Sequence, residues 1–223
     1  MCDLRSVIAD NIQRKPNLDE GLAAKIEATP EYAAVRRRMI ADLPGLPGEP
    51  RILDIGPAMG WELTALRERF PSAEVWGVTL FEEETRAWPL DAIARVCDMH
   101  SLGAAGIQAE SFDLVYAAHV LEHSPAPIVA LDEMATVCKP GGWVEIVMPE
   151  PYGVVHLGSE RAFRMTDIAE HVFCAGIDTV VTMLRHAGLR FHSYREYAVT
   201  AGGKLHYWNR CWRAQRPSSG GVL

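Results

Sequence analysis

The chain has 223 residues, of which 48% are hydrophobic, and its 29 acidic and 22 basic residues give a formal net charge of −7. This length and apolar content suit one domain with a full core and a small appendage. A protein whose main partner is nucleic acid usually carries the opposite charge balance, which argues against such a partner. The 5 cysteines form no CxxC pair and are typical of free thiols in a reducing compartment. Without an apolar signal segment or a membrane-spanning stretch, the sequence predicts a cytoplasmic protein with no membrane partner.

Residues 1–50 are predicted to form a helical N-terminal extension. The segments 17–28 and 29–43 place apolar residues at helical spacing, and a linker rich in Pro and Gly follows at 44–50. An extension of this kind is able to fold over the edge of a neighbouring domain as a lid. Three consecutive arginines, Arg36 to Arg38, cannot share one helical face, which favours a solvated surface over a phosphate site.

From residue 51 onward the chain alternates between strand and helix patterns. The predicted strands lie at 51–55, 74–80, 95–99, 112–120 and 143–149, and the predicted helices at 61–70, 82–94 and 125–139. Strands and helices that alternate with short connections form a mostly parallel sheet covered on both faces. The sequence therefore predicts a doubly wound α/β domain over residues 51–214, followed by a flexible tail at 215–223.

The last part of the predicted domain departs from this alternation. After an irregular stretch at 150–166, a long helix is predicted to begin at Asp167, which forms the spacing of a capping box with Glu170. The segments 190–199 and 204–214 are typical of two strands joined as a hairpin. The prediction is thus a seven-stranded, mostly parallel sheet with an antiparallel last strand.

Four segments, in this order and at these distances, resemble the class I S-adenosylmethionine-dependent methyltransferases. They are "LDIGPAMG" at 53–60, "VWGVTLFEEE" at 75–84, "CDMHSLGAAGIQAESFDLVYAAHVLEH" at 97–123 and "CKPGGWVEIVMP" at 138–149. A glycine-rich turn alone is weak evidence, whereas the ordered series is specific. The resemblance implies a Rossmann-like fold and S-adenosyl-L-methionine as the cofactor.

The turn after the first strand carries residues that the resemblance assigns to the methionine end of the cofactor. Asp54, at the strand tip, is expected to reach the ammonium group, while Gly56 and Gly60 let the backbone approach the ligand closely. Ala58 stands where the family commonly has a further glycine. The alternatives are an ordinary strand–helix turn with an incidental acid, and a dinucleotide site, whose GxGxxG template these positions fit poorly.

The resemblance also assigns residues to the adenosine end. Many family members have an acid at the tip of the second strand; here Thr79 and Leu80 resemble the cyclopropane-synthase and sterol-methyltransferase branch, in which a later polar residue, here Glu84, contacts the ribose. After the third strand, Asp98 is expected to accept from the adenine amino group and the amide of Met99 to read a ring nitrogen. The alternatives are helix N-terminal acids near Glu84 and a helix cap at Asp98.

Methyl transfer is an in-line displacement that needs alignment, exclusion of water and, for a protonated nucleophile, a base. The candidates follow the fourth and fifth strands: His119, which is also placed near the cofactor, and Glu150, Tyr152 and His156 in the next loop. Each loop residue is equally compatible with an exposed position. His119 and His123 have a spacing that can bind metal, but no third ligand accompanies them, so no metal is predicted.

These observations predict transfer of a methyl group to a small-molecule acceptor, through a hydroxyl or similar nucleophile of a biosynthetic intermediate. The alternatives are methylation of RNA or protein, which predicts a basic surface or an added domain, and a non-catalytic partner subunit that has lost the site. A homodimer is compatible with the sequence. The sequence does not name the acceptor.

Overall fold

The computed structural model describes residues 30–150, 173, 175–201 and 204–218. Its strands are β1 (Arg51–Ile55), β2 (Glu74–Thr79), β3 (Ile93–Val96), β4 (Phe112–Ala118), β5 (Cys138–Pro149), β6 (Arg190–Ala201) and β7 (Lys204–Gln215). Its α-helices are α3 (Pro30–Ala41), α4 (Trp61–Arg69), α5 (Pro127–Val137) and α6 (Ile177–His186). Short 3-10 helices lie at η1 (Glu82–Ala87), η2 (Met99–Ser101) and η3 (Leu121–His123).

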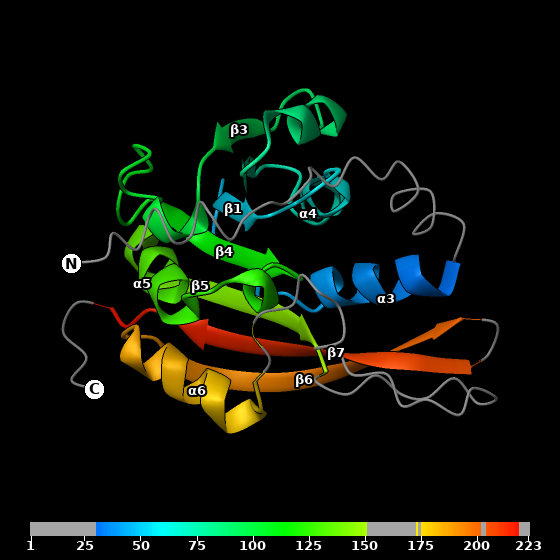
Figure 1. The fold of residues 1–223 in the computed structure, drawn as a ribbon. Helices are drawn as coiled ribbons and strands as arrows, with labels where there is room; N and C mark the ends of the chain where they lie inside the picture. Colours follow the sequence, from blue (N-terminus) through cyan, green and yellow to red (C-terminus); the bar gives the residue numbers. More distant parts are fainter. Residues whose placement is uncertain (1–29, 151–172, 174, 202–203, 219–223) are drawn as a thin grey trace.

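All seven strands form one sheet in the order β3-β2-β1-β4-β5-β7-β6 (Figure 1). β1 pairs in parallel with both β2 and β4, and β4 pairs in parallel with β5. β7 inserts between β5 and β6 and pairs antiparallel with both. The predicted Rossmann-like sheet with an antiparallel last strand is therefore confirmed. The parallel strands all end at one side of the sheet, called here the carboxyl edge.

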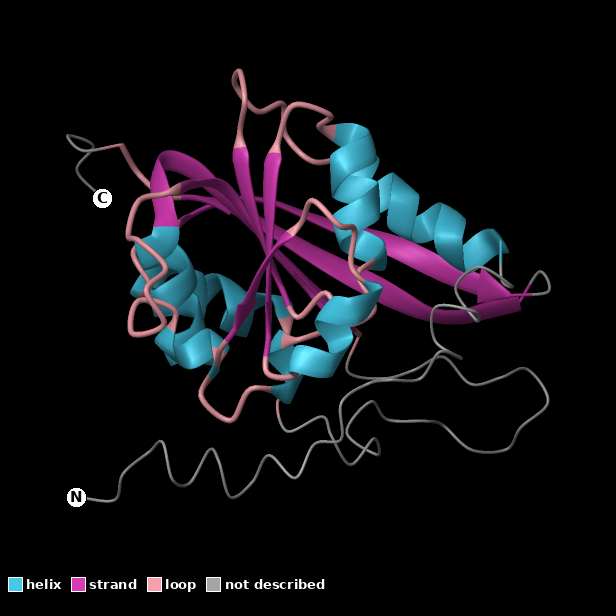
Figure 2. Cartoon of the chain, turned by 90° about the horizontal axis from the view of Figure 1, so that it is seen from above, coloured by secondary structure: helices cyan, strands magenta, loops and turns pink. Residues whose placement is uncertain are grey.

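Helices cover both faces of the sheet (Figure 2). On one face α3 and α4 pack with alternate strand residues such as Ile52, while on the other face α5 and α6 pack with residues such as Leu53. Because side chains alternate along a strand, Asp54 lies on the same face as Ile52. The α3–α4 face is therefore the one on which the acid of the first motif stands.

The structure corrects three predicted elements. The predicted helix 82–94 stops at η1, because Pro89 forces Trp88 into an extended conformation and leaves β3 to begin at Ile93 and end before Cys97. The helix predicted over 125–139 ends at Val137, and β5 takes up the chain directly at Cys138. The described part of the long helix begins only at Ile177; Asp167 and Glu170 lie outside the described residues.

A buried polar network fastens the C-terminal end of α3 to the sheet. Glu145 of β5 accepts from Arg213 Nε at 2.7 Å and from Arg195 Nη2 at 2.8 Å. Both arginines also donate to the backbone oxygen of Asp42, at 2.7 and 2.9 Å, and Tyr197 Oη donates to the Asp42 carboxylate at 2.7 Å. α3 consequently lies beside the β6–β7 hairpin (Figure 1).

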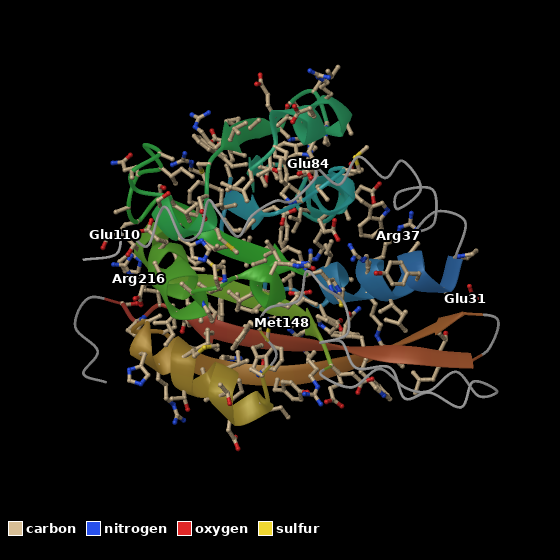
Figure 3. All side chains as sticks on the ribbon, viewed as in Figure 1. Glu31, Arg37, Glu84, Glu110, Met148 and Arg216 are labelled. Atoms are coloured by element: carbon tan, nitrogen blue, oxygen red, sulfur yellow. The ribbon has the colours of Figure 1, made fainter. Side chains whose placement is uncertain are left out.

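At the edge of the sheet opposite the carboxyl edge, Arg216 holds the end of β7 in place. It pairs with Glu110 at 2.7 Å and donates to the backbone oxygen of Cys138 at 2.6 Å. Figure 3 shows Glu110 and Arg216 together at the far side of the molecule from Arg37 of α3. None of the helices within the described ranges is long and apolar enough to cross a membrane.

Replacing Glu145 with Ala should destabilise the protein by about 3–5 kcal/mol, because the buried Arg213 and the partly buried Arg195 lose their anion. Glu74→Ala is the matched control: Glu74 pairs with Arg51 in an exposed ion pair, and its loss should cost less than about 1 kcal/mol. Urea denaturation of both variants measures the difference. Equal losses would show that the Glu145 network does not hold α3.

Candidate functional site

The turn between β1 and α4 packs tightly against neighbouring segments of the chain. Gly56 donates its N–H to Val78 O at 2.8 Å, and a Cβ built on it would meet Val120 at 2.7 Å. Gly56 and Gly60 have φ of 72° and 79°, which glycine adopts at little cost. Ala58 also takes a left-handed conformation, with φ of 46°, where a glycine would be unstrained. The turn thus needs its glycines for both conformation and close approach.

Trp88, which follows η1, supports this turn from the side of β2. Its Nε1 donates to Ala58 O at 2.6 Å. A Cβ added to Gly60 would meet the Trp88 Cδ1 at 2.8 Å, and one added to Gly77 of β2 would meet the ring at 2.5 Å. One buried indole therefore ties the turn to the sheet, and Gly77 is the strand position that makes room for it.

Asp54, the residue before the last of β1, carries a buried carboxyl group, with only 1% of the residue exposed. Its Oδ2 has no hydrogen-bond partner among the described residues. Burial raises the pKa of Asp54 to about 8, although the nearby positive charge of Arg36 acts in the opposite direction. A buried carboxylate of this kind is unfavourable unless a cation joins it, so this position is suited to a positively charged ligand group.

Arg36 reaches the same region from α3. It is buried, its Nη1 donates to Glu62 of α4, and its Nη2 donates to the Tyr32 hydroxyl at 3.2 Å. The prediction of a solvated arginine triplet is wrong for Arg36, although Arg37 and Arg38 are exposed. The reason is helical periodicity: Arg36 falls on the buried face of α3.

The residues assigned to the ribose gather at the end of β2. Thr79 and Glu84 are both buried, and the Thr79 hydroxyl donates to Glu84 Oε2 at 2.5 Å. Thr79 Oγ1 also accepts from the backbone of Phe81 at 3.1 Å. Leu80, the residue between Thr79 and Phe81 in the chain, has an exposed apolar side chain. The structure thus brings a carboxylate and an apolar surface to the carboxyl edge next to β1.

Asp98 and Met99 lie beyond the end of β3. The Asp98 side chain caps η2 by accepting from His100 N at 2.9 Å, and its Oδ1 also meets His100 Nδ1 at 2.5 Å. Met99 is buried in the core beside α5. The cap that was the alternative interpretation of Asp98 is present, and the carboxylate remains 26% exposed. Both roles are therefore compatible with one position.

His119 directly follows β4 with φ of 55°, a left-handed conformation that is uncommon outside glycine and frequent at functional positions. Its Nδ1 lies 3.4 Å from Glu122 Oε1, and its Nε2 has no hydrogen-bond partner among the described residues. Burial lowers the pKa of His119, while the nearby Glu122 carboxylate acts to raise it. The ring is thus mostly neutral at neutral pH and oriented by a carboxylate that is itself buried.

The other catalytic candidates differ in their placement. Glu150 follows β5, but its Oε1 accepts from Trp208 N at 3.1 Å and its N–H donates to Trp208 O at 2.9 Å, so it extends the pairing of β5 with β7. Tyr152 and His156 lie outside the described residues. Among the described residues, no three His, Cys, Asp or Glu side chains are grouped in a way that could hold a metal ion.

Asn209 of β7 is a buried polar residue that sequence reasoning did not single out. It is fully buried, and neither its Oδ1 nor its Nδ2 has a hydrogen-bond partner among the described residues. Asn209 stands opposite Pro149, the last residue of β5, and opposite Tyr197 of β6. The alternation of side chains along β7 could have indicated its burial, because it places the Asn209 amide on the same face of the sheet as Cys211.

The carboxyl edge therefore collects Asp54, whose Oδ2 has no partner among the described residues, and the glycine turn after β1. Glu84, Leu80 and Asp98 follow β2 and β3 at the same edge. These features suit a ligand with a cationic amino-acid end and an adenosine end. A sheet of this order with such a turn after β1 defines a class I S-adenosylmethionine-dependent methyltransferase.

Comparison with known families agrees with this class. A family described as a methyltransferase domain matches residues 17–194. Because the match covers well over half of the chain, the chain belongs to this methyltransferase domain family. It is an enzyme that uses S-adenosylmethionine.

Two relatives and one solved structure illustrate the similarity. The ubiquinone biosynthesis O-methyltransferase of Leptothrix cholodnii is 24% identical over 183 residues, which cover 72% of this chain and 77% of that protein. The protein of the same name from Chromobacterium violaceum is 28% identical over 62% of this chain and 64% of its own length. The S-adenosylmethionine-dependent methyltransferase from Mesorhizobium loti has the same fold, with a TM-score of 0.63 at 19% identity over 86% of this chain and 100% of that chain.

Asp54→Asn should abolish the rise in melting temperature that S-adenosylmethionine causes, while leaving the cofactor-free protein at least as stable as the wild type at pH 8. The folded carboxyl group has a pKa raised to about 8 from an ordinary 3.8, so the folded protein holds an extra proton between these values. The free energy of unfolding therefore falls as pH rises through this window, and a neutral amide removes that loss.

Thermal melts between pH 5 and 9, with and without S-adenosylhomocysteine, measure both effects. Asp132→Asn, at an exposed acid on α5, is the control and should change neither. Normal stabilisation of Asp54→Asn by the cofactor would show that the ammonium binds elsewhere.

Proposed function

We propose that this methyltransferase acts on a hydroxyl group of a small-molecule acceptor, with His119 as the general base. The observation that carries the proposal is the state of the His119 ring. Glu122 Oε1 lies 3.4 Å from Nδ1, and the buried Nε2 has no hydrogen-bond partner among the described residues. A neutral imidazole with one nitrogen oriented by a carboxylate is the arrangement of a base, and the lowered pKa of His119 keeps it neutral at pH 7.

S-adenosylmethionine, when bound, supplies a methyl group on a positively charged sulfur. The acceptor oxygen forms a bond to the methyl carbon as the carbon–sulfur bond breaks, and S-adenosylhomocysteine leaves. His119 Nε2 takes the hydroxyl proton, and Glu122, which is 2% exposed, stabilises the resulting imidazolium. His119 afterwards releases the proton to solvent. The names of both relatives, each an O-methyltransferase, support oxygen as the methylated atom.

Asn209 supports a polar acceptor rather than a purely apolar one. β7 lies two strands from β4 in the sheet order, which is about 10 Å, so a single small molecule can reach both His119 and Asn209. An unpaired buried amide disfavours folding unless a ligand completes its hydrogen bonds. We therefore propose that Asn209 binds a second polar group of the acceptor, with Glu150 holding the adjoining strand pairing in place. Tyr152 and His156 remain predictions for the same side of the site.

The N-terminal extension is proposed to close the site. Its described helix α3 already brings Arg36 beside Glu62 of α4, next to the cofactor turn. Residues 1–50 are thus proposed as a lid and 51–214 as the methyltransferase domain. The cytoplasmic location, the absence of a metal and the possible homodimer also remain predictions.

His119→Ala should lower kcat by about a hundredfold or more at saturating cofactor, as expected for loss of a general base. The affinity for S-adenosylhomocysteine should change far less. In the wild type, kcat should be constant from pH 7 to 9 and fall only below 6.5, the ordinary pKa of a histidine, because burial lowers the pKa of His119.

The assay transfers a radiolabelled methyl group to a panel of alcohols, phenols, carboxylic acids and amines. His186→Ala, at an exposed histidine of α6, is the control and should retain the wild-type rate. Transfer confined to the amines, or an unchanged pH profile in His119→Ala, would contradict the proposal.

Asn209→Leu should raise the KM for the best oxygen acceptor of this panel by about tenfold, while the free energy of unfolding stays equal or rises by about 1 kcal/mol. Leucine has nearly the shape of asparagine but needs no hydrogen bonds. Urea denaturation and steady-state kinetics give the two values. A large loss of stability with an unchanged KM would show that the amide serves the fold and not the acceptor.

A further inference from the structure

His100 occupies a position between two segments of the site. Its Nδ1 lies 2.5 Å from Asp98 Oδ1, and its Nε2 lies 2.6 Å from Ser124 Oγ. The His100 backbone N–H donates to the same Asp98 oxygen at 2.9 Å. The imidazole is 6% exposed, whereas the Asp98 side chain is 26% exposed. A nearly buried histidine thus holds one oxygen of a carboxylate that reaches the surface of the site.

Ser124 belongs to the loop that follows β4. It is 1% exposed, its N–H donates to Leu121 O at 2.9 Å, and its Oγ accepts from Ala126 N at 3.1 Å. Because Oγ already accepts from a backbone amide, its hydrogen is available to donate to His100 Nε2. In that arrangement His100 Nδ1 donates to Asp98 Oδ1.

We propose that His100 is a positioning residue for the cofactor. It fixes the plane of the Asp98 carboxylate for the adenine amino group, and through Ser124 it ties that acid to the loop at 119–124, which carries His119 and Glu122. The inference rests on the proposed role of Asp98 and deepens it. The backbone N–H and the ring of His100 both contact the same Asp98 oxygen, which restricts the orientation of the carboxylate. An acceptor held in one orientation discriminates between a ligand that donates a hydrogen bond and one that does not.

The same three residue types form the triad of serine hydrolases, in which an acid orients a histidine and the histidine activates a serine. Here the serine is buried and its oxygen is engaged by the amide of Ala126. Ser124 is therefore not presented to a substrate, and the order of the three residues serves positioning instead.

The consequence is that recognition of adenine and the placement of the base depend on one side chain. Asp98 and Ser124 lie on loops that follow β3 and β4, and β2 and β1 separate these strands in the sheet. Within the described network, the His100 ring connects the two loops directly. A substitution at His100 should therefore affect cofactor selectivity first, and turnover through the loop second.

The test compares two variants of His100 by calorimetry with S-adenosylhomocysteine and with S-inosylhomocysteine, in which a carbonyl replaces the adenine amino group. His100→Phe keeps a ring but removes both nitrogens, so the affinity for S-adenosylhomocysteine should fall about tenfold and the preference over the inosine analogue should largely vanish. His100→Asn retains a donor near the place of Nδ1 and should retain the preference. His186→Phe is the matched control.

Ser124→Ala provides an independent measurement if His100→Phe does not fold. It leaves the contact between His100 and Asp98 in place, so adenine preference should weaken only partly, while kcat at saturating cofactor should fall several-fold because the loop of His119 is released. Full adenine preference in His100→Phe, or an unchanged kcat in Ser124→Ala, would overturn the positioning role. A wild type that binds neither ligand would instead refute the proposed function.

Discussion

The site depends on one buried acid, Asp54, which is next to the last residue of the central strand β1. β2 and β4 pair with β1 on either side, and Asp54 is only 1% exposed. Such a group is stable in a folded protein only when it takes up a proton or when a cation joins it. The first option describes the cofactor-free protein, and we propose that the ammonium group of the cofactor provides the second.

The surrounding structure limits how far the protein can adapt to that charge. Trp88 and the glycines at 56 and 60 hold the turn against the sheet. The Asp54 side chain therefore stays in its buried position. Arg36 contributes a positive charge, but it is committed to Glu62 of α4 and does not neutralise Asp54. The Glu145 network keeps α3, and therefore Arg36, on the sheet. The fold thus keeps a destabilised group where the ligand needs it, which is a common relation between stability and function.

The polar residues of the acceptor side follow the same principle. His119 has a strained backbone and an unpaired nitrogen, and Asn209 is buried without hydrogen bonds among the described residues. Both positions are unfavourable for folding alone, and both lie at the carboxyl edge, His119 directly after β4 and Asn209 on β7 opposite the last residue of β5. His100 adds a link between the loops of β3 and β4, so the two ends of the site are not independent.

The sequence by itself determined the sheet and the cofactor, whereas the roles of the site residues stay predictions. Strand patterns, the glycine turn and Asp54 depend on residues close together in the chain, and local patterns predict such features well. The helix expected at 82–94 was wrong because Pro89 overrides the helical pattern. The tertiary structure alone decided that Glu150 binds the backbone of Trp208 and that His100 meets Ser124. These partners are 58 and 24 residues apart, and only the order of strands in the sheet brings such distant residues into contact.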